Sequence, residues 1–478
     1  MTFQSINPAT EDVLATFDEF SPQQTEQALV QADAAFRARR RTSFAERAKL
    51  MQRAAQLLRE RKRRYGGLVT AEMGKPIAAA EAEIEKCAWA CEFFAEHAER
   101  FLSDEPVRTE ARASYVAFEP LGVILAVMPW NFPFWQVFRF AAPTLMAGNT
   151  ALLKHASNVP QCALAIEEVF RDAGFPAGTF RTLLLSGGTV DALIGDARVR
   201  AVSLTGSDAT GEKVAAAAGR ALKKVVLELG GSDPFIVLAD ADLDAAVETA
   251  VQARFQNTGQ SCIAAKRFIV EAAVADEFER QFAAGIRKLK IGDPMDRTVE
   301  VGPLARGDLR DALDRQVRES VAQGARVVVG GKAIGGRGYF YEPTLLSDAT
   351  RQMPVLREET FGPVAALVRV PDADAAIALA NDTAFGLGAS LWTQDLDRAR
   401  QLAARIEAGS VFVNAMVASD PRLPFGGVKR SGYGRELGLF GIREFVNIQT
   451  VVISEVRRRM DYVKTTASSE PRRVTSVE

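Results

Sequence analysis

The chain has 478 residues, 47% hydrophobic and 25% charged, as in an ordinary globular protein of two or three domains. Lysine and arginine number 59 against 60 aspartate and glutamate, so the balance does not indicate nucleic acid or an anionic membrane as a partner. Two histidines and four cysteines leave little material for a histidine-rich metal centre or a disulfide framework, and they fit a reducing cytoplasm. No signal peptide is read at the N-terminus, and no apolar run reaches the ~18 residues of a membrane helix.

The first hundred residues are predicted to be mainly helical. Apolar residues recur at three-to-four spacing over residues 22–38 and 45–64, which is typical of amphipathic helices. The basic run 59–64 is interpreted as a solvated helix face rather than a nucleic-acid patch, because the whole chain is nearly neutral. Cys87 and Cys91 lie one helical turn apart near His97, but further ligands are missing, so packing is favoured over a metal site.

From Leu121 onward, apolar and helical segments alternate, which predicts βαβ units and a parallel sheet. The first series comprises segments 123–127, 141–147, 150–154, 160–173, 199–204, 211–221 and 225–229. The second contains strands over 234–237, 327–329, 364–370 and 411–413. Two α/β domains that meet near Gly230-Gly231 are therefore predicted, and the polar tail 461–478 is predicted to be disordered.

Three segments carry candidate chemistry. Cys262 follows the small polar run Asn257–Ser261, which indicates an exposed turn where a thiol meets a substrate. Glu228 ends an apolar strand before two glycines, where open α/β sheets bind ligands and where partial burial raises a carboxyl pKa toward that of a general base. Gly206 and Ser207 lead from a strand into a helix, whose free N–H groups suit a phosphate, although the spacing is not the GxGxxG fingerprint.

Five motifs occur in one order along the chain: Pro-Trp-Asn-Phe-Pro at 129–133, Glu-Leu-Gly-Gly at 228–231, Gly-Gln-Ser-Cys at 259–262, Glu-Thr-Phe-Gly-Pro at 359–363 and Pro-Phe-Gly-Gly-Val-Lys-Arg-Ser-Gly at 424–432. In this the sequence resembles the aldehyde dehydrogenase superfamily from about residue 6 to about residue 450. The resemblance implies an α/β enzyme with a Rossmann-like cofactor domain, a catalytic domain and a small β arm. The cofactor domain is expected over residues 1–102 and 121–230, and the catalytic domain over residues 231–445. The arm is expected over residues 103–120 and 446–460.

The resemblance also implies the roles of the catalytic residues. Cys262 matches the nucleophile, whose thiolate adds to the aldehyde, while the Asn131 amide and the Cys262 backbone N–H hold the oxyanion. Glu228 matches the base that activates the water for hydrolysis of the thioester. Eight residues of this chain match cofactor-binding positions of the family: Trp130, Lys154, Ser157, Gly206, Ser207, Leu229, Glu359 and Phe361.

Two positions depart from common patterns of the family. Glu436 matches a relay glutamate, but Phe140 replaces the lysine often paired with it, so Glu436 receives no role. Ser157 stands where many NAD-specific members carry a glutamate, and a neutral side chain does not repel a 2′-phosphate. The expected cofactor is therefore NAD or NADP.

The expected substrate pocket is polar, with Gln136, Arg139, Gln256 and Ser419 at the matching positions. A guanidinium forms a fork for a carboxylate, and Arg139 matches an arginine of succinate-semialdehyde dehydrogenases. Gln256 stands where other members of that activity carry a second arginine, and Ala264 where they often carry a second cysteine. An arginine at the position of Arg139 also occurs in lactaldehyde dehydrogenases, so that substrate stays open. The alternative that Arg139 is a structural salt-bridge partner stays open as well.

Other members of the superfamily act differently. CoA-acylating members lack the glutamate that matches Glu228, so its presence favours hydrolysis to a free acid. Crystallin-like members are structural proteins, but the intact set of Asn131, Glu228, Cys262 and Glu359 favours an enzyme. The resemblance further implies a cytoplasmic homodimer or homotetramer, assembled through the β arm, with a small aldehyde as partner and neither nucleic acid nor membrane.

Overall fold

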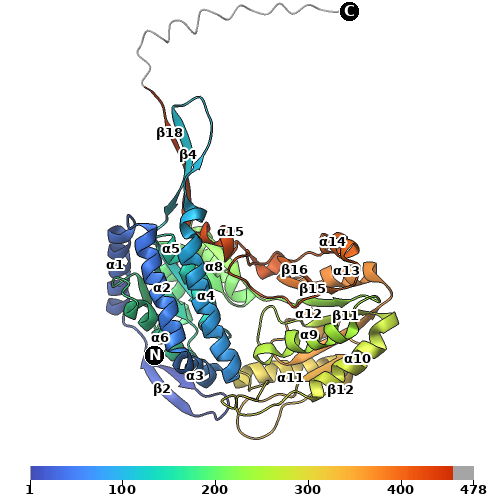
Figure 1. Cartoon of the computed structure of the whole chain (residues 1–478). Coiled ribbons are helices and arrows are strands. Elements are labelled where there is room, and N and C mark those ends of the chain that lie inside the picture. The colour runs from blue at the N-terminus through green and yellow to red at the C-terminus, as the bar shows by residue number, and fades with distance from the viewer. Residues whose placement is uncertain (1, 456–478) are drawn as a thin grey trace, which may run out of the picture.

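A computed structural model describes residues 2–455, arranged as two lobes with a projecting arm (Figure 1). The first lobe is built on a six-stranded sheet with the order β17-β9-β8-β5-β6-β7. Its strands are β5 (Val123–Met128), β6 (Thr150–His155), β7 (Phe180–Thr182), β8 (Val199–Thr205), β9 (Lys224–Glu228) and β17 (Gly432–Tyr433). All neighbours pair in parallel except β17, which pairs antiparallel with β9. The predicted parallel sheet is confirmed.

Helices cover both faces of this sheet. The alternate residues of β5 explain why: Ile124 and Ala126 belong to one core cluster, whereas Val123 and Leu125 belong to another. The first cluster involves helices α2 (Phe44–Glu60), α3 (Lys62–Met73), α4 (Ile77–Leu102), α5 (Trp135–Met146) and α6 (Pro160–Asp172). The second involves α1 (Pro22–Arg39), α7 (Val190–Gly195) and α8 (Asp208–Arg220). Strands buried on both faces produce the continuous apolar runs that made them recognisable in the sequence.

The helix expected over 45–64 is two helices, because the chain turns at Arg61 between α2 and α3. The Arg61 guanidinium binds Glu168 and Asp172 of α6 at 2.9 and 2.6 Å. Arg59 pairs with Glu85 and Glu92 of α4. The basic run 59–64 therefore faces carboxylates of its own domain.

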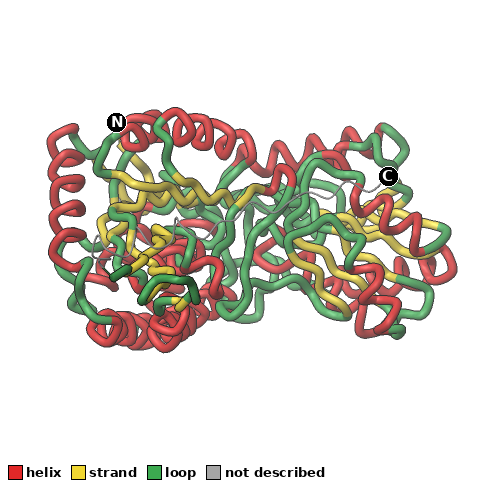
Figure 2. Tube along the Cα trace, turned by 90° about the horizontal axis from the view of Figure 1, so that it is seen from above, coloured by secondary structure: helices red, strands yellow, loops and turns green. Residues whose placement is uncertain are grey.

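The second lobe is built on a seven-stranded sheet with the order β12-β13-β14-β11-β10-β15-β16. Its strands are β10 (Pro234–Val237), β11 (Arg267–Glu271), β12 (Arg326–Val329), β13 (Thr344–Ser347), β14 (Val364–Val370), β15 (Gly388–Trp392) and β16 (Ser410–Val413). They are parallel apart from β12. The accompanying helices are α9 (Leu243–Phe255), α10 (Ala272–Arg287), α11 (Gly307–Ala322), α12 (Pro354–Arg357), α13 (Ala373–Asn381) and α14 (Leu396–Ala403). Seen from above, loops fill the region between the two sheets (Figure 2).

After β16 the chain returns to the first lobe, which differs from the expected division at residue 445. Strand β17 joins the first sheet, and Ile442 of helix α15 (Gly438–Ile442) lies in the first lobe's core cluster. The arm consists of β3 (Glu105–Pro106), β4 (Ala113–Pro120) and β18 (Val446–Ile453). Strands β1 (Thr2–Ile6) and β2 (Val13–Asp18) form a separate antiparallel pair. The tail predicted over 461–478 lies outside the described residues.

A buried ion pair fixes the start of α5, the helix that leads away from Asn131. Lys75 and Glu83 pair with each other, with side chains 1% and 2% exposed. Glu83 Oε1 also accepts the backbone N–H groups of Phe134 and Trp135, both at 2.9 Å, and Lys75 Nζ lies 3.7 Å from the centre of the Phe132 ring. A carboxylate at a helix N-terminus is stabilising, so this pair anchors the loop that carries Asn131.

We expect Lys75→Met to lower the free energy of unfolding by about 3–5 kcal/mol, because the Glu83 carboxylate is left buried without its cation. Urea unfolding measures the loss. Adding Glu83→Gln removes that charge yet still accepts the two N–H groups, so the double variant should regain much of the stability. The exposed Lys49→Met serves as control. A double variant no more stable than Lys75→Met alone would contradict this account.

Candidate active site

The candidate residues of the first lobe lie at one edge of its sheet. Glu228 ends β9, Gly206 follows β8, and Trp130-Asn131 follows β5. The strand order places β6 on one side of β5 and β8 on the other, so this edge contains the switch point where open α/β sheets bind ligands. Cys262 reaches the same place from the second lobe, since a Cβ atom at Gly231 would lie 2.6 Å from its carbonyl oxygen.

The turn before Cys262 is buried, which corrects the expectation of an exposed turn. Gln260 and Ser261 are fully buried, whereas Cys262 is partly exposed. Asn257 and Thr258 adopt left-handed backbone angles, with φ of 52° and 57°. Such a conformation is costly for a β-branched threonine, and strain of this kind collects where surrounding structure enforces it, often at functional sites.

Lys266 holds this turn in place. Its fully buried ammonium group donates to the carbonyl oxygens of Ser261, Cys262 and Ala264 at 3.0, 2.7 and 3.2 Å. Its nitrogen also lies 3.6 Å from Glu359 Oε1, which accepts the Gly231 N–H at 3.0 Å. Cys262 therefore lies next to a buried cation that its sequence motif did not reveal.

The Asn131 amide is oriented from both ends. Gln136 Nε2 donates to Asn131 Oδ1 at 3.0 Å, and Asn131 Nδ2 donates to the Gln260 carbonyl at 3.1 Å. Asn257 Nδ2 donates to the Asn131 backbone carbonyl at 2.8 Å. An amide nitrogen carries two hydrogens, so one of them stays available to an oxygen beside Cys262.

Glu228 is buried against glycine. A Cβ atom at Gly426 would lie 2.8 Å from Glu228 Oε1, so the Pro-Phe-Gly-Gly motif leaves room for this carboxylate. Neither of its oxygens has a hydrogen-bond partner among residues 2–455. Burial raises the pKa of Glu228 well above its ordinary value, and the Glu436 charge raises it further, whereas Arg139 lowers it. A carboxyl group of this kind suits general-base chemistry near neutral pH.

Arg139 lies between two buried carboxylates, which differs from the open fork expected for a substrate. Its Nε is bound to Glu436, and its Nη2 lies 3.9 Å from Glu228 Oε2 and 3.4 Å from Thr205 Oγ1. Its guanidinium also stacks 4.6 Å from the centre of the Phe425 ring. Glu436, to which the sequence assigned no role, is thus the partner of Arg139.

The same charges act on Cys262. Burial raises the pKa of its thiol to about 12, while Arg139 and Lys266 lower it and Glu359 and Glu228 raise it. In this arrangement the sulfur is held as a thiol beside two cations that favour its ionisation.

A small cavity of about 90 Å³ opens beside Cys262. It brings together all four expected substrate residues, Gln136, Arg139, Gln256 and Ser419. It is far smaller than the roughly 300–1,000 Å³ of drug-sized pockets, which favours a short ligand. Lys86 also lines it. The sequence offered little signal for Lys86, because a lysine within a helical pattern reads as a solvated side chain.

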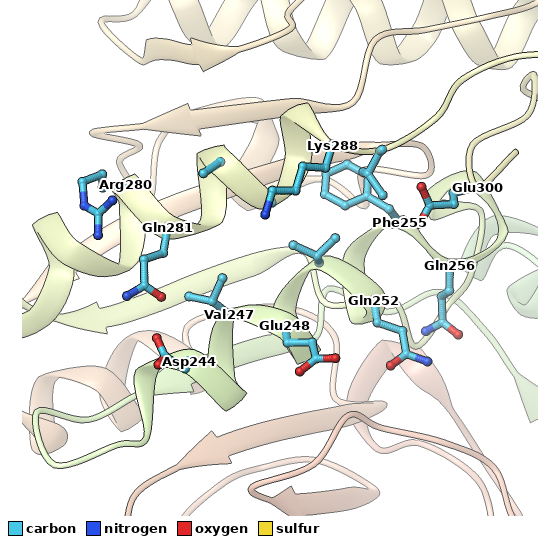
Figure 3. A pocket seen from close by; sticks show the side chains of 14 residues that line it. Asp244, Val247, Glu248, Gln252, Phe255, Gln256, Arg280, Gln281, Lys288 and Glu300 are labelled. Carbon is cyan, nitrogen blue, oxygen red and sulfur yellow. The ribbon is translucent and has the colours of Figure 1, made fainter. Parts of the chain in front are cut away.

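A larger groove of about 640 Å³ lies between α9 and α10 (Figure 3). Its charged lining is mixed, with Asp244 and Glu248 on α9 and Arg280 on α10. It shares Gln256 with the Cys262 cavity but contains neither the cysteine nor Glu228. Of these two cavities, the smaller one therefore contains the candidate nucleophile.

The expected cofactor residues line the neighbouring strand ends. Lys154 lies near the end of β6, half-buried, and burial lowers its pKa. Ser157 is exposed nearby. Ser207 caps α8 and accepts the Thr210 N–H at 3.3 Å, so the predicted strand-to-helix turn is present. Gly206 precedes it, with no atom closer than 3.8 Å to an added Cβ.

The remaining expected cofactor residues lie nearer Cys262. Glu359 lies beside the first glycine of the Glu-Leu-Gly-Gly motif, since a Cβ atom at Gly230 would lie 2.5 Å from its Oε2. The rings of Trp130 and Phe361 meet edge to face with centres 5.7 Å apart. Leu229 is buried against Gly211 of α8.

Within residues 2–455, no group of three histidine, cysteine, aspartate or glutamate side chains could hold a metal ion. Cys87 and Cys91 are buried, and His97 packs against the Phe93 ring at 4.5 Å. No helix in the same range is long and apolar enough to cross a membrane.

Comparison with known proteins gives a consistent result. The model of the aldehyde dehydrogenase family matches residues 1–451. A probable succinate-semialdehyde dehydrogenase, NADP(+), of Synechocystis sp. is 54% identical over 454 residues, covering 95% of this chain and 100% of the relative. A succinate-semialdehyde dehydrogenase, NADP(+), of Mycobacterium tuberculosis is 51% identical over 457 residues, with coverage of 95% and 100%.

Solved structures agree. Succinic semialdehyde dehydrogenase from Streptococcus pyogenes, in complex with NADP+, superposes with a TM-score of 0.93 at 38% identity, covering 95% of this chain and 100% of that one. Succinate-semialdehyde dehydrogenase from Burkholderia pseudomallei gives 0.92 at 36% identity, with 95% coverage of both chains.

Of the four cysteines, all within the described residues, only Cys262 is partly exposed, so we expect iodoacetamide to modify one thiol per chain. Because the thiolate is the nucleophile, the rate should rise about tenfold per pH unit up to about pH 9, without a plateau. Mass spectrometry identifies the peptide, and Cys262→Ala is the control. A plateau near neutral pH would show that Arg139 and Lys266 outweigh burial.

Proposed function

Since the chain belongs to the aldehyde dehydrogenase family, we propose that it oxidises succinate semialdehyde to succinate with NADP+ or NAD+. The observation that carries the proposal is the small cavity beside Cys262, whose wall contains the cations of Arg139 and Lys86. Together with the relatives' printed substrate, it favours a short aldehyde that carries a carboxylate.

The first half of the reaction uses Cys262 and Asn131. The Cys262 thiol loses its proton to water, and the thiolate adds to the aldehyde carbon. A C–S bond forms, the C=O π bond breaks, and the carbonyl oxygen becomes an oxyanion. The free N–H of the Asn131 amide and the Cys262 backbone N–H donate to that oxygen, and each such donor is worth about 3–4 kcal/mol. A bound nicotinamide cofactor would supply the hydride acceptor. Loss of the hydride from this carbon re-forms the C=O bond and leaves a thioester on Cys262.

The second half uses Glu228. Its carboxylate takes a proton from a water molecule, the hydroxide oxygen bonds to the thioester carbon, and the C–S bond breaks to release the acid and the Cys262 thiolate. The room left by Gly426 and the absence of a protein hydrogen bond to Glu228, among the described residues, leave its oxygens able to accept from water. The raised pKa of Glu228 makes it a stronger base than an ordinary glutamate.

The residues at the carboxyl edge of the first sheet fit a dinucleotide. Lys154 has no ion-pair partner within 4.0 Å among residues 2–455, and a half-buried cation gains from hydroxyl or phosphate oxygens. The N-terminus of α8, behind the open Gly206, suits the pyrophosphate. Glu359 and Phe361 would lie at the nicotinamide end, beside Cys262. The uncharged Ser157 admits both NAD+ and NADP+.

We place the enzyme in the cytoplasm as a homodimer or homotetramer that assembles through its arm. Exposed Ile448, Val452 and Ile453 on β18 supply an apolar strand for such contact. Light scattering of the purified chain tests the assembly.

The substrate is tested by NADH and NADPH formation with succinate semialdehyde, butanal and lactaldehyde. Succinate semialdehyde should give the highest kcat/KM, because butanal has the same carbon chain without a carboxylate. A higher kcat/KM for lactaldehyde would contradict succinate semialdehyde as the substrate and would support lactaldehyde, the alternative that the sequence left open. Formation of a CoA ester only when CoA is added would contradict hydrolysis.

We predict that Glu228→Gln forms the first equivalent of reduced cofactor and then turns over slowly. The amide keeps the shape of the side chain but cannot accept the proton of water. Stopped-flow absorbance should show a burst of about one reduced cofactor per site. Cys262→Ala should show neither phase. Loss of the burst in Glu228→Gln would show that Glu228 also acts before hydride transfer.

Ser157→Glu should weaken NADP+ far more than NAD+. A carboxylate about 4 Å from a 2′-phosphate costs about 4 kcal/mol at an effective dielectric constant near 20, whereas it can accept from the free ribose hydroxyls of NAD+. The KM values for both cofactors measure the difference, with Ser157→Gln as the uncharged control. Equal losses would show that this side chain does not face the ribose.

A further inference from the structure

Lys86 and Ser419 form a pair of donors on the wall of the Cys262 cavity. Lys86 comes from α4, whereas Ser419 lies in the loop after β16. Lys86 Nζ donates to Ser419 Oγ at 2.9 Å and lies 4.4 Å from the centre of the Trp135 ring. The indole N–H of Trp135 donates to the same Ser419 oxygen at 3.1 Å.

This arrangement supplies more donors than acceptors. The Ser419 oxygen already accepts twice, so its own O–H can only donate, and no acceptor for it occurs among residues 2–455. The Lys86 ammonium group has two further hydrogens. On the same wall, the buried Gln256 Nε2 has no partner in the described residues. The missing component is a group that only accepts, which describes a carboxylate.

The charges near Lys86 lead to the same conclusion, because each nearby carboxylate already has another cation. Glu83 is paired with Lys75, and Asp420 is bound by the Arg422 guanidinium at 2.6 Å. Lys86 itself has no carboxylate within 4.0 Å in the described part of the chain. Arg139, the other cation of the cavity, is bound to Glu436.

We propose that Lys86, together with Ser419, binds the distal carboxylate of the substrate and thereby sets the preference for aldehydes that carry one. Arg139 remains paired with Glu436 and contributes to binding of the substrate carboxylate only through its positive charge. This inference rests on the proposed function, because it assigns the substrate carboxylate to a place in the same cavity. It replaces the expectation from the sequence that the Arg139 guanidinium binds the substrate carboxylate directly.

The test compares Lys86→Met and Lys86→Arg by the ratio of kcat/KM for succinate semialdehyde to kcat/KM for butanal. Lys86→Met keeps the length of the side chain against Trp135 but removes the charge, so the ratio should fall about ten- to a hundred-fold. Lys86→Arg should keep most of the ratio. Lys49→Met, an exposed lysine on α2, is the matched control and should leave both substrates unchanged.

A pH profile separates binding from a structural role. Burial and the Arg139 charge lower the pKa of Lys86 to about 8, while Asp420 and, on its own helix, Glu83 and Cys87 raise it. The ratio should therefore fall above about pH 8, because kcat/KM reports the free enzyme. In Lys86→Arg the fall should disappear, since a guanidinium keeps its proton. Ionisation of Cys262 affects both substrates and cancels in the ratio.

Inhibition of butanal oxidation by succinate keeps this inference separate from the proposed function. Succinate should inhibit the wild-type enzyme and should inhibit Lys86→Met at least tenfold less, whatever the natural aldehyde is. If the wild type does not prefer succinate semialdehyde to butanal, the proposed function is wrong, but loss of succinate inhibition in Lys86→Met would still support the carboxylate site. A Lys86→Met ratio within twofold of wild type, or a pH-independent wild-type ratio, would overturn the assignment of Lys86.

Discussion

The arrangement of the site depends on one buried arginine between two buried carboxylates. Arg139 comes from the helix after Asn131, Glu228 from the end of β9, and Glu436 from the segment that returns after the second sheet. Buried charges are costly unless they are paired, and removing one partner leaves the other unsatisfied. This requirement holds three distant parts of the chain together. It also keeps Glu228, the proposed general base, next to a cation without a direct hydrogen bond.

The two lobes contribute different residues to the candidate active site. The first sheet presents Asn131, Glu228 and the cofactor residues along one edge, as parallel sheets commonly do. The second lobe supplies Cys262, the proposed nucleophile, after a strained, buried turn, and Lys266 fixes this segment through three carbonyl oxygens. Because Arg139 is committed to protein carboxylates, recognition of a substrate carboxylate passes to another cation, and Lys86 is the one that faces the cavity without an ion-pair partner among residues 2–455.

The sequence predicted those parts in which a local pattern decides the structure. Strands buried on both faces produce apolar runs, so β5, β6, β8 and β9 were recognised, and the turn from strand to helix at Gly206-Ser207 was predicted as well. The four expected substrate residues do share one cavity. Contacts between distant segments were beyond such patterns. The carboxylate that binds Arg139 was not identified, because Glu436 lies far along the chain. Lys86 was not singled out at all, and the polar turn before Cys262 was predicted to be exposed, although it is buried.

The most direct test of the account is the covalent state of Cys262 during turnover. Glu228→Gln is mixed with succinate semialdehyde and NADP+, quenched in acid and digested, and the peptides are identified by mass spectrometry. The account predicts a succinyl thioester on the peptide that contains Cys262 and on no other peptide. Accumulation of reduced cofactor without a modified Cys262, or an acyl group on a different residue, would contradict it.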